Sequence, residues 1–432
     1  MSFPRYERYK DSGVEWLGEV PAHWEVWKLP HAFRLIGSGT TPKSDNLAYY
    51  ENGSIAWLNT GDLNDGELFD CEKRITELAM KDHSSLKLYR AGAMVIAMYG
   101  ATIGKLAMLR FPATVNQACC VFSESSQIVS KFMFYWFLGL RQQIVSLATG
   151  GGQPNISQDI LRGLRVACPR IEEQSTIAAF LDRETAKIDE LIAEQQQLIE
   201  LLKEKRQAVI SHAVTKGLDP DVPMKDSGIE WLGEVPAHWE LKRLKHCFRL
   251  LTEKTNRREN PVALENVESW SGRFIKTETV YEGDGVAFER GDILFGKLRP
   301  YLAKVYLTEN KGEAIGDFHV LHPKGATYSR FSQYQILNRE FIDVVDGSTF
   351  GAKMPRVSWD FLGNIILTVP PFSEQQTIAS FLDRETTKVD ELIAEAQRAI
   401  TLLQERRTAL ISAAVTGKID VRGLVSDERV VE

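Results

Sequence analysis

Several short motifs in the chain contain residue types that could support catalysis. The pair Pro220-Asp221 and the later run Glu240-Leu241-Lys242 supply, in order, the two carboxylates and the lysine of a Mg²⁺ site for phosphodiester cleavage. The aspartate follows a predicted helix end, however. A near-identical stretch elsewhere carries Glu25-Val26-Trp27 at the matching place, without the lysine. We therefore interpret this match as coincidental.

A second motif, Val369-Pro370-Pro371-Phe372, is similar to the segment with which amino-methyltransferases hold the target amine. A valine side chain cannot make the hydrogen bond that this role requires. Gly150-Gly151-Gly152 lacks the following Lys-Ser/Thr of a phosphate-binding loop, and His319 and His322 have no further metal ligands nearby. The sequence therefore predicts no catalytic residue, no metal site and no cofactor bound by this chain.

Polar and cationic side chains instead gather at predicted turns between short apolar strands. Arginine and lysine hydrogen-bond guanine, asparagine and glutamine bind adenine, and lysine, threonine and backbone amides serve phosphates. We expect these turns to contact DNA, although a solvated surface is the alternative for any single residue. The candidates in the first long segment are Thr41, Lys43, Ser44, Tyr99, Thr102, Lys105 and Gln153. Those in the second are Lys254, Asn256, Arg257, Arg258, Lys297, Arg299, Tyr301, Lys304, Lys353 and Arg356.

The elements that position these turns occur twice in the chain. Residues 10–25 and 225–240 are identical at 15 of 16 positions, and residues 174–194 and 375–395 at 17 of 21. The long segments between them have diverged, although matches such as Lys105 with Lys304 remain. Surfaces that stay alike predict two contacts with one kind of partner, and surfaces that differ predict two targets. The alternative is that the repeated parts only pack on each other and that the loops have diverged without a functional reason.

The second repeated block begins a long helix in each copy. Apolar residues recur every seven positions without Gly or Pro, which predicts two antiparallel coiled-coil helices, each about 65 Å long. Ser373 with Gln376 predicts a capping box for the second helix, and Gly217 and Gly417 predict the two ends. The predicted seam comprises Leu181, Ile188, Gln195, Leu202 and Val209, with Leu191, Ile192, Leu198 and Ile199 between them, and Leu382, Val389, Ala396, Leu403 and Leu410 in the second copy, with Leu392, Ile393 and Ile400 between them.

Bulk composition sets limits on where and how the chain acts. The net charge is −6, so any contact with DNA must come from local patches and not from overall charge. The five cysteines form no CxxC pair, and the start of the chain lacks a secretory apolar stretch. The most apolar runs are interrupted by Lys105 and Arg141, so neither predicts a membrane span. We expect a cytoplasmic protein with reduced thiols.

Taken together, these residues resemble the specificity (S) subunits of type I restriction-modification systems. The resemblance rests on the EWLGEVPAHWE box before each long segment and on the helix starts at Pro169–Asp182 and Pro370–Asp383. It also rests on Gly92–Lys105 with Asn116-Gln117, and on Gly296–Leu302 with Asp317-Phe318. As a combination these motifs are specific, and they cover nearly the whole chain.

The resemblance implies an α+β fold in which two target recognition domains, each mixed α/β, are separated by two antiparallel coiled-coil helices. Each domain would read one half of a bipartite site in double-stranded DNA. Two methyltransferase (M) subunits and restriction (R) subunits would supply S-adenosylmethionine, ATP and Mg²⁺. The repeated boxes, with Trp16, Trp24, Trp231 and Trp239, would dock the M subunits.

The predicted domains follow this order along the chain. They are a first recognition domain with its box at 1–170, a helix at 171–217, a second recognition domain at 218–369, a helix at 370–418 and a tail at 419–432. The alternative from a different class is a scaffold that brings together two copies of one partner without contacting DNA.

Overall fold

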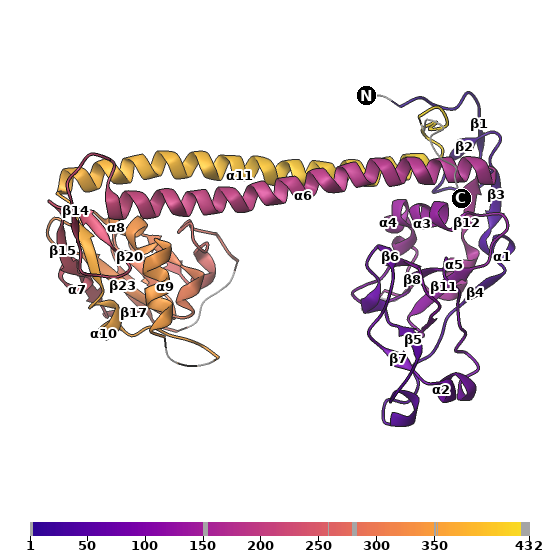
Figure 1. Ribbon diagram of the computed structural model, residues 1–432, viewed down its shortest axis with the longest axis horizontal. Coiled ribbons are helices and arrows are strands. Elements are labelled where there is room, and N and C mark those ends of the chain that lie inside the picture. Colours follow the sequence, from indigo (N-terminus) through magenta and orange to yellow (C-terminus); the bar gives the residue numbers. More distant parts are fainter. Residues whose placement is uncertain are drawn as a thin grey trace. The chain divides into compact units, whose positions relative to one another are not determined.

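A computed structural model of the chain describes residues 3–149, 154–257, 259–278, 283–349, 351 and 353–424. Two compact units are present (Figure 1). Unit 1 comprises Met1–Glu194 with Ala399–Glu432, and unit 2 comprises Gln195–Arg398. Each unit combines one globular segment with part of both long helices. Two of the predicted DNA-contact residues, Gln153 and Arg258, lie outside the described residues.

Unit 1 begins with a box hairpin, β1 (Tyr9–Asp11) with β2 (Glu19–Pro21). The globular segment is closed by an antiparallel pair of β3 (Glu25–Lys28) and β12 (Arg165–Cys168). Its main sheet has the order β4-β11-β8-β9-β6, and a smaller sheet has the order β10-β5-β7. The strands are β4 (Leu35–Gly37), β5 (Ile55–Leu58), β6 (Gly66–Leu68), β7 (Arg74–Ile75), β8 (Met94–Ala97), β9 (Leu106–Leu109), β10 (Thr114–Val115) and β11 (Cys119–Ser123).

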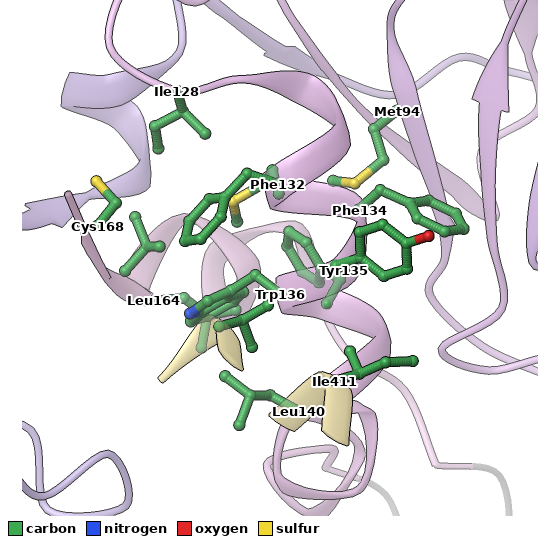
Figure 2. Packing of buried hydrophobic residues seen from close by; sticks show 14 of the residues in the cluster. Met94, Ile128, Phe132, Phe134, Tyr135, Trp136, Leu140, Leu164, Cys168 and Ile411 are labelled. Atoms are coloured by element: carbon green, nitrogen blue, oxygen red, sulfur yellow. The ribbon is translucent and has the colours of Figure 1, made fainter. Parts of the chain in front are cut away.

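The main sheet of unit 1 is covered on both faces, since every residue of its interior strands β8, β9 and β11 is buried. Met94 and Ile96 of β8 face one cluster, while Val95 and Ala97 face the other, as the two-residue period of a strand requires. Figure 2 shows the first cluster, in which Phe132 and Trp136 of α3 (Ser130–Gly139) lie near Leu164 and Cys168. The other helices here are α1 (Leu29–Ala32), α2 (Glu77–Asp82), α4 (Arg141–Ser146) and α5 (Gln158–Gly163), with 3₁₀ turns η1 (Leu47–Tyr49) and η2 (Thr60–Asp62).

Unit 2 repeats this arrangement. A box hairpin of β13 (Met224–Asp226) and β14 (Glu234–Pro236) precedes the closing pair of β15 (Glu240–Arg243) and β24 (Ile366–Val369). Its main sheet, in the order β16-β23-β20-β21, matches β4-β11-β8-β9, and a second sheet has the order β17-β19-β22-β18. The strands are β16 (Phe248–Leu251), β17 (Lys254–Thr255), β18 (Pro261–Val262), β19 (Gly285–Phe288), β20 (Ile293–Gly296), β21 (Val305–Leu307), β22 (Gly312–Ala314) and β23 (Phe318–Pro323). Helices are α7 (Leu244–Cys247), α8 (Ser329–Ile336), α9 (Arg339–Gly347) and α10 (Trp359–Leu362), with η3 (Leu264–Asn266) and η4 (Pro300–Leu302).

The two long helices are α6 (Ile171–Lys216) and α11 (Phe372–Val415). In unit 1, Ile411 near the end of α11 lies in the same core as Leu181 near the start of α6. In unit 2, Ile210 near the end of α6 packs with Leu382 near the start of α11. Within each unit the helices are therefore antiparallel, as predicted. Most predicted seam residues are buried: Leu181, Ile188 and Leu202 in α6, and Leu382, Val389, Ala396 and Leu410 in α11.

Two details of the helix prediction are wrong. Leu191, Leu198 and Leu392 are 44%, 42% and 49% exposed, because a pair of helices covers only a narrow stripe of each. Ser373 is the second residue of α11 and not its cap; the amides of Glu374 and Gln375 donate to the carbonyl of Pro371 instead, at 2.9 and 3.0 Å. The predicted ends are confirmed, since Gly217 and Gly417 adopt left-handed φ angles of +80° and +71°.

Candidate DNA interface

Three segments of unit 2 meet at the turn that follows β20. The Lys297 amide donates to the carbonyl of Asp317 at 2.9 Å, and the Val357 amide donates to the carbonyl of Lys297 at 3.0 Å. The Arg299 amide donates to the carbonyl of Pro355 at 2.8 Å. These bonds hold the turn at 297–304 against the residues that precede β23 and against the segment at 355–357. Predicted DNA-contact residues from distant parts of the chain are thereby brought together.

The side chains at this junction form a cationic cluster around one carboxylate. Arg356 donates to Asp317 from Nη2 at 2.9 Å and from Nε at 3.3 Å. The Lys297 ammonium lies 3.8 Å from the same carboxylate. The hydrogen bonds that Arg356 donates to Asp317 raise the pKa of Arg356, which stays charged at any physiological pH. We name Lys297, Arg299, Asp317 and Arg356 the unit 2 turn cluster.

The backbone of this turn is strained where an arginine occupies a position that favours glycine. Arg299 has a φ of +51° and Ala303 a φ of +46°, both in the left-handed region. The matching residues of unit 1 are Gly100 and Gly104, with φ angles of +82° and +78°. The same turn is therefore built in both units, and only unit 2 carries a long cationic side chain at its first left-handed position.

Two of the three hydrogen bonds at the unit 2 turn recur at the matching junction of unit 1, where the side chains differ. The Met98 amide donates to the carbonyl of Ala118, and the Ile156 amide donates to the carbonyl of Met98, both at 2.8 Å. The backbone of Asn155 forms an antiparallel β-bridge with Tyr99, just as the backbone of Arg356 does with Leu298. Met98, Gly100, Ala118 and Asn155 thus stand where unit 2 has Lys297, Arg299, Asp317 and Arg356.

Hydroxyls and carboxamides take the place of charges around the unit 1 junction. Thr41 Oγ1 donates to Gln117 Oε1 at 2.6 Å, and Asn116 Nδ2 donates to Asn59 Oδ1 at 3.1 Å. The prediction from sequence did not include Asn59, Asn116, Gln117 and Asn155 among the contact residues. Asn116-Gln117 stood out only through the family resemblance, since a lone amide residue in a loop carries no signal of its own.

The remaining predicted contact residues occupy varied environments. Lys304 is half-buried and donates from Nζ to the carbonyls of Leu264 and Val267, at 2.7 and 2.9 Å. Burial lowers the pKa of Lys304, and this side chain stabilises the turn from inside. Tyr99 and Thr102 are half-buried. Those that are exposed are Thr41, Lys43, Ser44, Lys105, Lys254, Asn256, Arg257, Tyr301 and Lys353.

The repeated boxes attach to the helix starts through a tryptophan in each unit. Trp24 Nε1 donates to Glu173 Oε1 at 3.2 Å, and Trp239 Nε1 donates to Glu374 Oε1 at 3.0 Å. Both rings are fully buried, so neither offers a surface to a partner. Trp16 and Trp231 are half-buried, and their rings pack against Trp136 and Phe341 with centroid distances of 5.8 and 6.1 Å.

The motifs that suggested catalysis have structural roles. Glu240 and Lys242 pair with each other at 2.5 Å on β15, and Val369 lies opposite Glu240 in the closing strand pair. His319 bonds the carbonyl of Val357 at 3.1 Å, and His322 bonds Asp292 at 2.7 Å. Among the described residues, no group of three or more His, Cys, Asp or Glu side chains is arranged to hold a metal ion.

These two matched units with unlike turn surfaces are the architecture of a DNA specificity protein. The family model described as the type I restriction modification DNA specificity domain matches residues 21–201 and 236–402, and the chain belongs to this family. Within the described residues, no helix is long and apolar enough to cross a membrane.

Relatives of similar length support this assignment. The chain is 23% identical to the type I restriction enzyme EcoDI specificity subunit of Escherichia coli, over 85% of this chain and 88% of the relative. It is 24% identical to the MjaIX specificity subunit of Methanocaldococcus jannaschii, over 94% of this chain and 96% of the relative.

Solved structures have the same fold. A chain from a type I R-M system complex aligns with a TM-score of 0.69 and 13% identity, covering 92% of this chain and 98% of that one. The HsdS subunit from Thermoanaerobacter tengcongensis aligns with a TM-score of 0.53 and 13% identity, covering 93% and 98%.

Proposed function

We propose that this chain is the DNA-recognition subunit of a type I restriction-modification complex and that each globular segment reads one half of a bipartite site. The observation that carries the proposal is the matched turn after β8 and β20. Two of its backbone hydrogen bonds and one β-bridge occur at matching places in both units, while Met98, Gly100 and Asn155 replace Lys297, Arg299 and Arg356. A shared scaffold with unlike surface chemistry suits two different short sequences.

The domain limits that we propose remain those expected from the sequence. The first recognition domain spans 1–170 and the second 218–369, with helices at 171–217 and 370–418 and a tail at 419–432. We propose that the chain acts in the cytoplasm, where DNA and reduced thiols are found. The described cysteines are free and buried, which suits that environment.

In this proposal the chain carries no catalytic site, and partner subunits perform methylation and cleavage. Two copies of the methyltransferase subunit would dock on the repeated boxes, one on each. Glu15 and Glu19 in the first box, and Glu230 and Glu234 in the second, are exposed at matching positions. The half-buried Trp16 and Trp231 lie between them. Trp24 and Trp239 would act indirectly, by holding each box to its helix.

The docking proposal predicts a stepwise loss of partners. Reversing the charges of the first box with Glu15→Lys and Glu19→Lys should leave one methyltransferase copy bound. Reversing those of the second box as well, with Glu230→Lys and Glu234→Lys, should leave none. Light scattering of the purified complex measures the mass. Retention of both copies after four reversals would exclude the boxes as the docking surface.

Selection from random duplexes tests the recognition proposal directly. The chain with its methyltransferase partner should enrich one bipartite sequence, and methylome sequencing should report the same sequence as modified. If the complex assembles but enriches no sequence, the chain is a scaffold, which is the alternative function. Replacing residues 26–168 with those of another family member should change one half-site only.

The helices would set the distance between the half-sites. Both α6 and α11 are unbroken over 46 and 44 residues, which suits a spacer. Deleting residues 195–201 and 396–402 together removes one heptad from each helix, or about 10 Å of length. The gap in the selected sequence should shorten by about three base pairs, with both half-sites unchanged. An unchanged gap would exclude the spacer role.

A further inference from the structure

The geometry of the unit 2 turn cluster distinguishes one arginine from its cationic neighbours. Arg356 is the member whose guanidinium is held by a carboxylate through two hydrogen bonds, from Nη2 and Nε to Asp317. Its backbone is fixed as well, since Arg356 pairs with Leu298 across the junction and the neighbouring Val357 amide donates to Lys297. Position and orientation of this side chain are therefore both set before any ligand arrives.

This arrangement leaves N–H donors at the end of the Arg356 guanidinium that can bind another acceptor. A guanidinium has five N–H donors in a rigid fork, and Asp317 engages one on Nε and one on Nη2. The two donors of Nη1 and the second donor of Nη2 remain. An end-on pair of this kind fits the O6 and N7 acceptors of guanine in the major groove. The Arg356 side chain is 40% exposed and therefore accessible from solvent.

The carboxylate argues against a phosphate as the ligand of Arg356. Asp317 sits 2.9 Å from the guanidinium and 3.8 Å from the Lys297 ammonium, so a phosphate at this place would meet a negative charge. A neutral base edge meets no such repulsion. Fixing the fork also reduces the side-chain entropy that is lost on forming two hydrogen bonds. Exposed Lys353, by contrast, has the properties of a phosphate contact.

The matching place in unit 1 has different chemistry. Asn155 is exposed where unit 2 has Arg356, and Ala118 stands where unit 2 has Asp317. A carboxamide can bind adenine through two hydrogen bonds but cannot supply a charged fork to guanine. The two half-sites should therefore differ at the base pair beneath this turn.

We propose that Arg356 reads a guanine in the half-site bound by unit 2, and that Asp317 is a positioning residue that orients its guanidinium. The proposal rests on the proposed function of the chain as a DNA-recognition subunit. It assigns one base pair of one half-site to one named side chain.

The test is selection from random duplexes by the full chain in complex with its methyltransferase partner. Wild type should enrich a half-site with an invariant G·C pair. Arg356→Ala should relax that one position by roughly 5- to 150-fold and leave the other half-site unchanged. Asp317→Asn keeps the size of the side chain and removes its charge, and it should relax the same position by a smaller factor. Combining both changes should add little to Arg356→Ala alone, because Asp317 acts through Arg356.

Two matched variants separate base reading from general effects. Lys353→Ala should weaken binding to all sequences and reduce the salt dependence of the affinity, without changing the selected sequence. Asn155→Ala should alter the other half-site only. Thermal unfolding of each variant shows whether it is folded. Arg356→Lys retains the charge but lacks the planar fork that Asp317 orients, so the complex should fold and still lose selectivity at the same pair.

The outcomes distinguish the two proposals. If wild type enriches no bipartite sequence, the recognition function fails and the assignment of Arg356 fails with it. If wild type enriches a bipartite sequence but neither Arg356→Ala nor Arg356→Lys relaxes a G·C pair, the recognition function stands and the assignment of Arg356 is overturned. Relaxation of several positions at once by Asp317→Asn would contradict its role as a positioning residue.

Discussion

Arg206 of α6 and Asp390 of α11 form an ion pair in unit 2, with Nε 3.4 Å from Oδ1, and the same two residue types pair again in unit 1 as Arg407 and Asp189 at 2.8 Å. Each pair lies 201 positions from its counterpart in the sequence. The environments differ, because Arg206 is buried and also donates from Nη1 to the carbonyl of Trp270 at 2.9 Å. Arg407 and Asp189 are more exposed to solvent.

This difference predicts unequal effects of one substitution at two equivalent places. Arg206→Ala removes a buried charged hydrogen bond and leaves Asp390 with a weaker partner, so it should lower the free energy of unfolding by about 2–3 kcal/mol. Arg407→Ala removes a pair that solvent screens, and the loss should be under about 1 kcal/mol. Urea unfolding followed by circular dichroism measures both. Equal losses would show that the contact with Trp270 contributes nothing.

A buried glutamine lies at the start of each long helix, Gln174 in α6 and Gln375 in α11. In contrast to the two arginines, substitution of either glutamine should lower the free energy of unfolding by the same amount. Gln375 accepts from the Tyr328 amide at 2.8 Å and donates to the carbonyls of Ala326 and Pro370 at 3.0 and 2.9 Å. Gln174 makes the same three contacts in unit 1. Leucine at either position would leave buried backbone groups unpaired and should lower the free energy of unfolding by about 2–4 kcal/mol.

The control for the glutamines is exposed Gln376, one residue further along α11. Gln376→Leu should change the free energy of unfolding by less than about 0.5 kcal/mol. A loss at Gln375→Leu no larger than at Gln376→Leu would mean that these hydrogen bonds do not hold the helix to the globular segment.

Much of the framework could be predicted because its signals are local or repeated. A seven-residue period identifies the buried seam residues Leu181 and Leu382 without any knowledge of the fold, and a glycine after the pattern marks each helix end. The same period placed Leu191 and Leu198 inside, and that was wrong. With only two helices in the bundle, residues beside the seam have no second neighbour to cover them.

The site was less predictable because its key contacts join residues far apart in the sequence. Asp317 and Arg356 are 39 positions apart and Trp24 and Glu173 are 149 apart. Composition shows that each of these residues is polar or aromatic, and nothing local shows that they meet. For the same reason Lys304, similar in type to exposed Lys105, was not distinguishable as a residue that turns inward to backbone carbonyls.

Glu67 on β6 predicts a specific acid dependence of unit 1. Its carboxylate accepts from Arg110 Nε at 2.8 Å and from Lys131 Nζ at 3.0 Å, and these hydrogen bonds lower its pKa to about 2. Because the pKa is lower in the folded state, the ionised carboxylate stabilises the fold at pH values above the ordinary glutamate pKa. This stabilisation is lost as the pH falls toward 2. Because all three groups are partly exposed, we expect a contribution of about 1–2 kcal/mol at pH 7.

Glu67→Gln measures this contribution. The variant should be less stable than wild type at pH 7, and the difference should shrink between about pH 5 and pH 2. Glu77→Gln, at an exposed residue in the first turn of α2, is the control, and its free energy of unfolding at pH 7 should differ from that of wild type by less than about 1 kcal/mol. A difference for Glu67→Gln that stays constant across this range would show that the ionised carboxylate is not what Arg110 and Lys131 stabilise.

The position of Arg299 predicts that this residue lowers the stability of the fold while its side chain strengthens DNA binding. Its φ of +51° costs about 1 kcal/mol relative to glycine, and unit 1 avoids this cost with Gly100. Both Arg299→Gly and Arg299→Ala remove the guanidinium and should weaken DNA binding by the same factor. Only the glycine relieves the strain, so Arg299→Gly should be more stable than Arg299→Ala by about 1 kcal/mol. Thermal unfolding gives the stabilities and fluorescence anisotropy with the selected duplex gives the affinities. Unchanged affinity in both variants would mean that the strained arginine is retained for a reason other than binding DNA.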